Sequence, residues 1–354
     1  MAASMGGFNR TIWTFLTLAL IACSPSPKLE TNTRSSHPIE TAQNSTDDEQ
    51  RDETENENEN ASEDAAEEAT APAFESGDLN VQWIHGAENC NNDQNPPLQV
   101  HQYNSSYYIL RQNKCLNFEA PFMYLILGQN KALLFDTGAT GNANTFPLRT
   151  MVEEILTSHL AQIGVERSAY DLVVAHSHAH GDHRAADNQF NNQENTVVVA
   201  PSVNDMTAFF GFNNWPNDSA SYDLGNRMID IIGIPGHETN SIAIYDRKTA
   251  TLLTGDTIYP GRLYIAEWNT YRQSIQRLAQ FVSGKALSFV LGAHIEMSDQ
   301  PGVDFPMGST FQPNEHILQL EGNQIQELNT ALEGAGDNPQ RIVRNKFIIF
   351  PTSL

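Results

Sequence analysis

Short apolar runs separated by turn residues alternate with amphipathic stretches from residue 122 to residue 350. The runs FMYLIL and ALLF, divided by GQNK, are typical of a hairpin of two strands. The helical stretches instead repeat their apolar positions every three or four residues. These patterns predict strands at 122–127, 132–135, 172–175, 196–200, 228–234, 242–245, 251–254 and 346–350, and helices at 148–163, 269–282 and 315–332. Strands followed by a helix, in a pattern that occurs twice, favour two packed sheets with helices outside, an α+β fold.

The first 23 residues have a single basic residue, Arg10, ahead of a short apolar core that ends in LIAC. Such a segment is typical of a secretory signal, because a membrane-spanning helix needs about 20 apolar residues. The ending resembles a bacterial lipobox, which implies cleavage before Cys23 and acylation of its thiol. We therefore expect an exported, lipid-anchored protein. Ser24, in place of a retaining aspartate, favours the outer membrane, facing the periplasm or the cell surface. An uncleaved anchor helix is the alternative.

Residues 24–75 are dominated by charge. They carry 15 acidic against three basic residues and so contribute −12 of the net charge of −23. The run DDEQRDETENENENASEDAAEE has no aromatic or branched aliphatic residue, so it cannot bury enough apolar surface to fold. We expect a disordered acidic tether, and the acidity argues against nucleic acid as a partner.

Residues 76–354 have a globular composition and suffice for one large domain. Two cysteines, Cys90 and Cys115, lie in this part of a chain that is expected outside the cytoplasm. An even pair in that setting favours a disulfide, with two free thiols as the alternative. The sequence gives no indication of the oligomeric state.

Four histidines and an aspartate follow the predicted strand 172–175 in the segment HSHAHGDH. Side chains alternate in an extended chain, so His178 and His180 point the same way. A glycine then lets the backbone turn, which brings Asp182 and His183 to the same place from the other side. Imidazole and carboxylate are ordinary zinc ligands, and crowded imidazoles gain nothing from burial alone. We therefore interpret the segment as a metal site.

Three later positions repeat one arrangement, a metal-binding side chain just past a strand and beside a turn residue. They are His237 in IPGH, Asp256 in LLTGDT and His294 in LGAH. A lone histidine after a strand is more often structural, but the clustered motif needs partners that these positions supply. We expect all three to complete the site.

These motifs, preceded by LLFDTG, resemble in kind and order those of the metallo-β-lactamase-fold hydrolase superfamily. The resemblance implies an αββα four-layer sandwich. The implied ligands of a first metal are His178, His180 and His237. Those of a second metal are Asp182, His183 and His294, with Asp256 bridging both. Asp136 resembles the family's aspartate that supports the ligands without binding metal. We interpret His176 as a supporting or strand-end residue.

The implied chemistry is hydrolysis by a hydroxide held between two cations, which requires no side-chain nucleophile. We expect two Zn²⁺, with Fe or Mn as alternatives, and we expect Asp182 to orient the hydroxide and relay its proton to the leaving group. The full ligand set favours an enzyme that acts on a small ester, lactone, thioester or amide-like substrate. A true zinc β-lactamase is one alternative, although such enzymes usually lack an aspartate bridge. A non-catalytic metal-binding protein of the same fold is another.

Two segments rich in aromatic and turn residues, 208–224 and 261–268, are candidate lids over the site. Within them, Trp215, Tyr264 and Trp268 are candidate contacts for an apolar acyl or aryl group of the substrate. Packing of these side chains within their own loops is the alternative.

Overall fold

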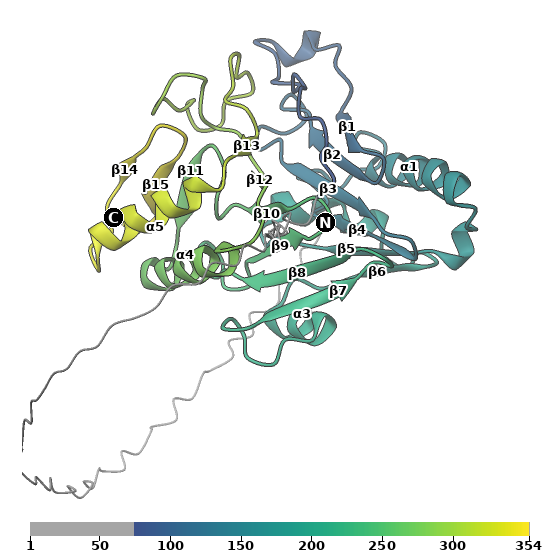
Figure 1. The fold of residues 1–354 in the computed structure, drawn as a ribbon. Helices are drawn as coiled ribbons and strands as arrows, with labels where there is room; N and C mark the ends of the chain where they lie inside the picture. The colour runs from purple at the N-terminus through teal and green to yellow at the C-terminus, as the bar shows by residue number, and fades with distance from the viewer. Residues whose placement is uncertain (1–73, 354) are drawn as a thin grey trace, which may run out of the picture. The chain divides into compact units, whose positions relative to one another are not determined.

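A computed structural model describes residues 74–353 of the chain (Figure 1). The predicted signal segment, Cys23 and nearly all of the predicted tether lie outside these residues. Among the helices that are described, none is both long enough and apolar enough to cross a bilayer.

The first of two large sheets has the strand order β1-β2-β3-β4-β5-β6. Its strands are β1 (Leu98–Asn104), β2 (Tyr107–Gln112), β3 (Phe122–Leu127), β4 (Lys131–Phe135), β5 (Asp171–Ala175) and β6 (Thr196–Val198). Strands β1 to β4 pair antiparallel, whereas β4, β5 and β6 pair parallel. The carboxyl ends of β4 and β5 therefore lie at the same edge, where Asp136 and His176 follow them.

The second large sheet has the order β13-β12-β10-β9-β8-β7. Its strands are β7 (Ser219–Asp223), β8 (Met228–Gly233), β9 (Ile242–Asp246), β10 (Thr251–Gly255), β12 (Phe289–Gly292) and β13 (Gln319–Leu320). Because β9 is antiparallel to both β8 and β10, and β12 is parallel to β10, the strands β8, β10 and β12 run in the same direction. The loops that carry His237, Asp256 and His294 thus leave from one edge of this sheet.

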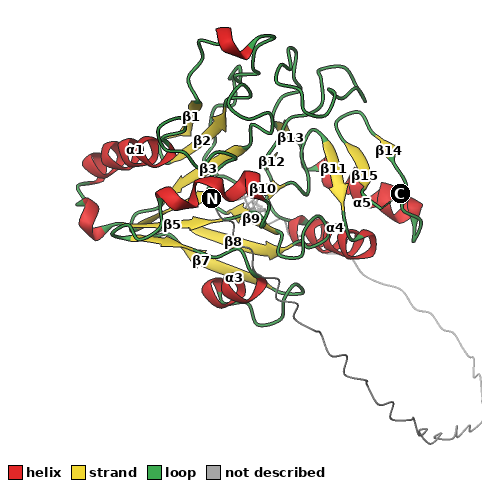
Figure 2. Cartoon of the chain, turned by 180° about the vertical axis from the view of Figure 1, so that it is seen from behind, coloured by secondary structure: helices red, strands yellow, loops and turns green. Residues whose placement is uncertain are grey.

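Helices cover the outer faces of both large sheets (Figure 2). Side chains of α1 (Leu148–Ile163) share an apolar core with the first sheet, and those of α4 (Trp268–Val282) and α5 (Asn323–Ala335) share one with the second. A third core lies between the sheets. In β4, Leu133 and Phe135 belong to this central core, while Leu134 packs on the α1 side. Alternate residues of one strand thus serve two cores. The four layers confirm the predicted αββα sandwich.

The first predicted helix has the predicted bounds, residues 148–163. Its apolar stripe buries Val152, Leu156 and Leu160 against the first sheet. Gly164 ends the helix in the left-handed conformation, with φ 69°, and its N–H donates to the Leu160 carbonyl. A glycine adopts this conformation without steric cost, which explains why the helix ends there.

The prediction of a helix at 315–332 was wrong for its first half, residues 315–322. Residues Gln319–Leu320 form β13 and pair with β12, so α5 begins only at Asn323. A backbone that donates to and accepts from a neighbouring strand cannot also form helical hydrogen bonds, and the sheet edge takes precedence here.

Much of each predicted lid belongs to a helix or a strand, although residues 211–218 form a loop between α3 and β7. Arg262–Ile265 forms β11, which pairs parallel with β15 (Ile348–Pro351) in a small third sheet completed by β14 (Ile342–Val343). In the other segment, α3 (Val203–Phe210) ends and β7 forms the outer strand of the second sheet. Both segments are therefore part of the folded layers. The remaining helical turns are α2 (Gly181–Arg184), η1 (Cys90–Asn92), η2 (Arg167–Ala169) and η3 (Ala185–Gln189).

Cys90 and Cys115 form a disulfide, as the sequence predicted. It ties the segment that precedes β1 to the loop between β2 and β3. Closing a loop with a sequence separation of 25 residues stabilises the fold by roughly 3 kcal/mol on the chain-entropy description.

Candidate metal centre

Loops after β5, β8, β10 and β12 bring all seven predicted ligands to one place. They fall into two groups, and within each group the ligand atoms lie within 4.8 Å of one another. The first group is His178, His180 and His237. The second group is Asp182, His183, Asp256 and His294. The turn expected at Gly181 is the start of the one-turn helix α2, which carries Asp182 and His183 back toward the histidines that precede it.

The first group presents three ring nitrogens to a common point. His178 Nε2 lies 3.0 Å from His180 Nδ1, and His237 Nε2 lies 3.2 Å and 3.0 Å from these two atoms. Burial lowers the pKa of His178 well below its ordinary value and lowers that of His237 as well. Neutral rings have lone pairs to offer, and three that converge in this way match the nitrogen ligands of a transition metal.

The opposite nitrogens of two rings are held by carbonyl groups. His237 Nδ1 donates to the Tyr264 carbonyl at 2.8 Å, and His294 Nδ1 donates to the Glu119 carbonyl at 2.9 Å. A carbonyl oxygen can only accept, so Nδ1 carries the proton and a neutral ring turns an Nε2 lone pair toward the centre. These backbone contacts therefore select the tautomer that binds a metal.

Asp136 holds a third ring in the same way. Its Oδ2 accepts from His183 Nδ1 at 2.9 Å and from Ser177 Oγ at 2.8 Å, while Oδ1 accepts from the Ser177 N–H at 2.7 Å. Asp136 is 1% exposed, and its backbone has φ 69°, a left-handed conformation that is uncommon outside glycine. It does not belong to either ligand group. The structure thus places Asp136 where it supports a ligand, as the sequence led us to expect.

We expect Asp136→Asn to weaken metal binding by the second group by about 10–100-fold, because an amide cannot hold the His183 ring as a carboxylate does. Competition with a fluorescent zinc chelator measures the affinity. Asp187→Asn is the matched control, since Asp187 accepts from His176 Nε2 at 2.8 Å, and His176 lies outside both groups. Equal weakening in both variants would contradict the role of Asp136.

Asp256 faces both groups at once. Its Oδ2 lies 3.9 Å from His178 Nε2 and 3.6 Å from His237 Nε2. Its Oδ1 lies 3.4 Å from His183 Nε2 and 3.2 Å from His294 Nε2. Asp256 is 8% exposed, and Oδ1 has no hydrogen-bond partner in the described part of the chain. A buried carboxylate oxygen without a donor indicates a cation, and the two oxygens are oriented as a bridging ligand requires.

The second group attracts positive charge. Burial alone would raise the pKa of Asp182 and Asp256, but the imidazoles of His183 and His294 hold both carboxyl pKa values well below the ordinary range. Burial also opposes charge on the two rings, yet the carboxylates, with Asp256 foremost, raise the pKa of His183 and His294 well above normal. Imidazole protons thus occupy positions that a metal cation would take, and metal binding would release them. The donor set of both groups fits two transition-metal cations.

A cavity of about 400 Å³ opens onto the centre. Its lining residues are His180, Asp182, His237, Asp256, Glu119, Tyr264, Ala266 and Thr352. Asp182 has a side chain that is 23% exposed and accessible from the cavity. Ala266, like Tyr264, belongs to the segment 261–268 that the sequence suggested as a lid, whereas Glu119 and Thr352 were not anticipated. No motif surrounds them, and they reach the cavity through the β2–β3 loop and through the pairing of β11 with β15.

Of the three predicted aromatic contacts, Tyr264 lines this cavity. Trp215 packs against Phe212, with ring centroids 5.3 Å apart, beside the core between the sheets. Trp268 lies in the core beneath α4 and α5, and its Nε1 donates to the Gly336 carbonyl at 2.9 Å. Neither tryptophan lines the cavity in the described structure, so both serve packing.

The profile of the Metallo-beta-lactamase superfamily matches residues 116–294. Among curated proteins, the chain is similar to the acyl-coenzyme A thioesterase MBLAC2 of Gallus gallus, with 32% identity over 80 residues, and to that of Bos taurus, with 26% identity over 180 residues. These matches cover 21% and 47% of this chain, and they span 28% and 62% of the relatives' lengths.

The chain also matches solved structures at low sequence identity. A metallo-beta-lactamase from Pontibacter korlensis has a TM-score of 0.43 and 15% identity, over 67% of this chain and 99% of its own. The metallo-beta-lactamase FIM-1 from Pseudomonas aeruginosa has a TM-score of 0.46 and 13% identity, over 69% of this chain and 98% of its own. The profile match covers half of the chain and contains all seven side chains of the two groups. The chain belongs to the metallo-beta-lactamase superfamily of hydrolases.

Proposed function

We propose that the protein is a dinuclear metal hydrolase that cleaves an ester or thioester bond of a small substrate. The observation that carries the proposal is the position of Asp256, whose two oxygens face two complete ligand groups. Zinc is the first candidate metal, because nitrogen and carboxylate ligands suit it, with iron and manganese as alternatives. Bound cations would supply a water of lowered pKa and a positively charged partner for the oxygen of the scissile group.

Asp182 is the proposed proton carrier. Its carboxylate is accessible from the cavity and lies 3.2 Å from His183 Nε2 and 3.4 Å from His294 Nε2. A carboxylate in this position can take the proton of the attacking water. The same carboxyl group then protonates the leaving oxygen or sulfur, which returns Asp182 to its starting form.

Two findings favour a thioester or an ester over the lactone and amide-like substrates that the sequence also allowed. The curated relatives of similar sequence are acyl-coenzyme A thioesterases, although the chain spans only part of their length. The cavity of about 400 Å³, with Tyr264 on its wall, has room for a small acyl group beside the centre.

We also propose that the protein acts outside the cytoplasm, anchored through a lipid on Cys23. The lipobox-like sequence LIAC supports this location. The disulfide between Cys90 and Cys115 supports it independently, because disulfides persist mainly in oxidising compartments. The net charge of −23 argues against nucleic acid as a partner.

We expect the purified chain to hydrolyse S-phenyl thioacetate and 4-nitrophenyl acetate, to lose both activities after dialysis against a chelator, and to regain them with zinc. Metal analysis of the same sample measures the number of ions per chain. Nitrocefin and bis(4-nitrophenyl) phosphate complete the panel. Preferred turnover of nitrocefin would replace the proposal with a β-lactamase. A zinc-loaded chain that hydrolyses none of the four would show that it is a metal-binding protein without this activity.

A further inference from the structure

A second cavity, of about 210 Å³, adjoins the cavity over the metal centre. Both cavities share Glu119 and Tyr264, and the second one also reaches the ligand His294. Its remaining walls come from two loops: the loop between β2 and β3, which carries Lys114, and the loop that follows His294, which carries Gln312. A substrate held at the centre can therefore extend into this second cavity.

Lys114 is a buried cation without a counter-ion. It is 3% exposed, and its Nζ donates to the Phe118 carbonyl at 3.0 Å. An ammonium group has three N–H donors, so two of them lack an acceptor in the described part of the protein. Burial, and then the charge of Arg111, lower the pKa of Lys114 to about 8. The carboxylates of Glu315, Glu296 and Glu119 oppose this lowering of the pKa. None of the three forms an ion pair with Lys114 in the described structure, so its two remaining N–H groups are available to an acceptor on a bound molecule.

The other strong cation of the cavity is already engaged. Arg262 binds Glu296 through Nη2 at 2.8 Å and Asp304 through Nη1 at 2.7 Å, and its Nε donates to Tyr264 Oη at 2.8 Å. Tyr264 accepts that bond, so its own hydroxyl proton is free for a ligand. Arg262 thus has a structural role, and Lys114 is left as the cation available to a bound group.

The cavity also contains an unsatisfied amide and an apolar rim. Gln312 is 3% exposed, and its Oε1 has no hydrogen-bond partner among residues 74–353. An amide oxygen only accepts, so this one fits a hydrogen-bond donor of a ligand and makes no contact with an anion. Phe118 and Met307 line the same cavity and are 41% and 68% exposed. A ligand with a short apolar spacer and a polar end matches this arrangement.

We propose that the second cavity binds a free carboxylate of the substrate, with Lys114 as its charged partner and the Tyr264 hydroxyl as a hydrogen-bond donor. The proposal rests on the proposed function and narrows its substrate class to half-esters or half-thioesters of dicarboxylic acids. The single ammonium group of Lys114 matches a ligand group with a single negative charge. The carboxylate of Glu119 on the shared wall disfavours a dianionic phosphate at the same place.

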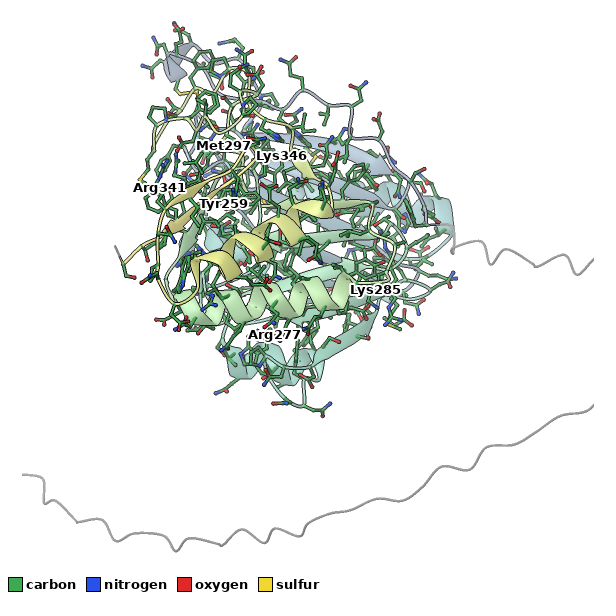
Figure 3. The ribbon with its side chains drawn as sticks, turned by 60° about the vertical axis from the view of Figure 1, so that its left-hand side comes forward. Tyr259, Arg277, Lys285, Met297, Arg341 and Lys346 are labelled. Carbon is green, nitrogen blue, oxygen red and sulfur yellow. A yellow bond between two sulfur atoms is a disulfide. The ribbon has the colours of Figure 1, made fainter. Side chains whose placement is uncertain are left out.

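The test compares two substrates that differ in one charge, mono-4-nitrophenyl glutarate and its neutral methyl ester. We expect the wild-type enzyme to prefer the charged substrate. Lys114→Met is expected to reduce the ratio of the two kcat/KM values by about 10–100-fold, the loss of one charged hydrogen-bonded contact, mainly through KM. Lys285→Met is the matched control, because Lys285 is exposed just beyond the end of α4 (Figure 3), and it should leave the ratio unchanged.

Calorimetric binding of glutarate and of neutral glutaramide to the zinc-loaded protein separates the two proposals. Hydrolysis with no charge preference, and no Lys114-dependent binding of glutarate, would overturn the carboxylate subsite and leave the hydrolase proposal intact. Lys114-dependent binding without any hydrolysis would overturn the hydrolase proposal and keep the subsite. If circular dichroism shows that Lys114→Met does not fold, Tyr264→Phe replaces it, and an unchanged preference in that variant would contradict the subsite.

Discussion

Asp182→Asn lowers kcat for the preferred ester or thioester by about 10²–10⁴-fold, the usual contribution of a positioned acid or base. Asparagine has nearly the same shape as aspartate but can neither take a proton from water nor return one to the leaving group. The side chain is accessible from the cavity, where a substrate and a water molecule would meet it. Steady-state kinetics of the zinc-loaded variant measure the loss.

The metal content of the variant decides how this loss is interpreted. Asp182 also lies 3.4 Å from His294 Nε2 within the second ligand group, so its removal can weaken metal binding. A slow variant that retains both metals supports the proton relay, whereas full activity with both metals bound would show that the relay is wrong. Asp337→Asn is the control, because that side chain is 89% exposed.

Arg227→Met destabilises the folded chain by roughly 3–5 kcal/mol, the cost of leaving one partner of a buried ion pair without its counter-ion. Arg227 is 2% exposed, and its Nε donates to Asp246 Oδ1 at 3.1 Å. Its Nη1 donates to the carbonyls of Ser106 at 2.8 Å and Leu127 at 3.1 Å. The substitution leaves a fully buried carboxylate and two carbonyl groups without this donor. Urea denaturation monitored by tryptophan fluorescence measures the change.

The position of Arg227 explains why the effect should be large. Ser106 and Leu127 belong to the first sheet and its hairpin turn, whereas Asp246 ends β9 in the second sheet. The guanidinium group therefore joins the two sheets as well as neutralising a charge. Arg272→Met is the matched control, since Arg272 pairs with the exposed Asp337, and such pairs contribute about 0–1 kcal/mol. A similar destabilisation in both variants would contradict the importance of the buried pair.

The central strands could be predicted from the sequence because they are buried on both faces. All six residues of β3 and all five of β9 are buried, and apart from Asp246 at the end of β9 each strand is a continuous apolar run. Strands β1 and β7 are the outer strands of their sheets and are half exposed. Their sequences, LQVHQYN and SASYD, contain too few apolar residues to produce that signal.

The metal ligands could be predicted for a different reason. Histidines and aspartates that follow apolar strands form a chemically specific set, whatever the path of the chain between them. Lys114 and Glu119 contain no such signal, because a single charged residue in a loop resembles any surface residue in the sequence. Trp215 is the converse case, a residue predicted to contact the substrate that does not line the cavity. An aromatic residue in a polar loop indicates either packing or binding, and only the fold shows that it packs against Phe212.

The distribution of the ligands over the two sheets affects how strongly the folded protein resists proteolysis. The ligands after β5 follow a strand of the first sheet, and His237, Asp256 and His294 follow strands of the second. Each bound ion would therefore cross-link the two sheets. Loss of the ions removes this cross-link and leaves the buried polar ligand side chains without the cations that would hold them. Resistance of the folded chain to proteolysis should therefore rise with the concentration of available metal. A shortage of the metal would then shorten the lifetime of the enzyme as well as limit catalysis.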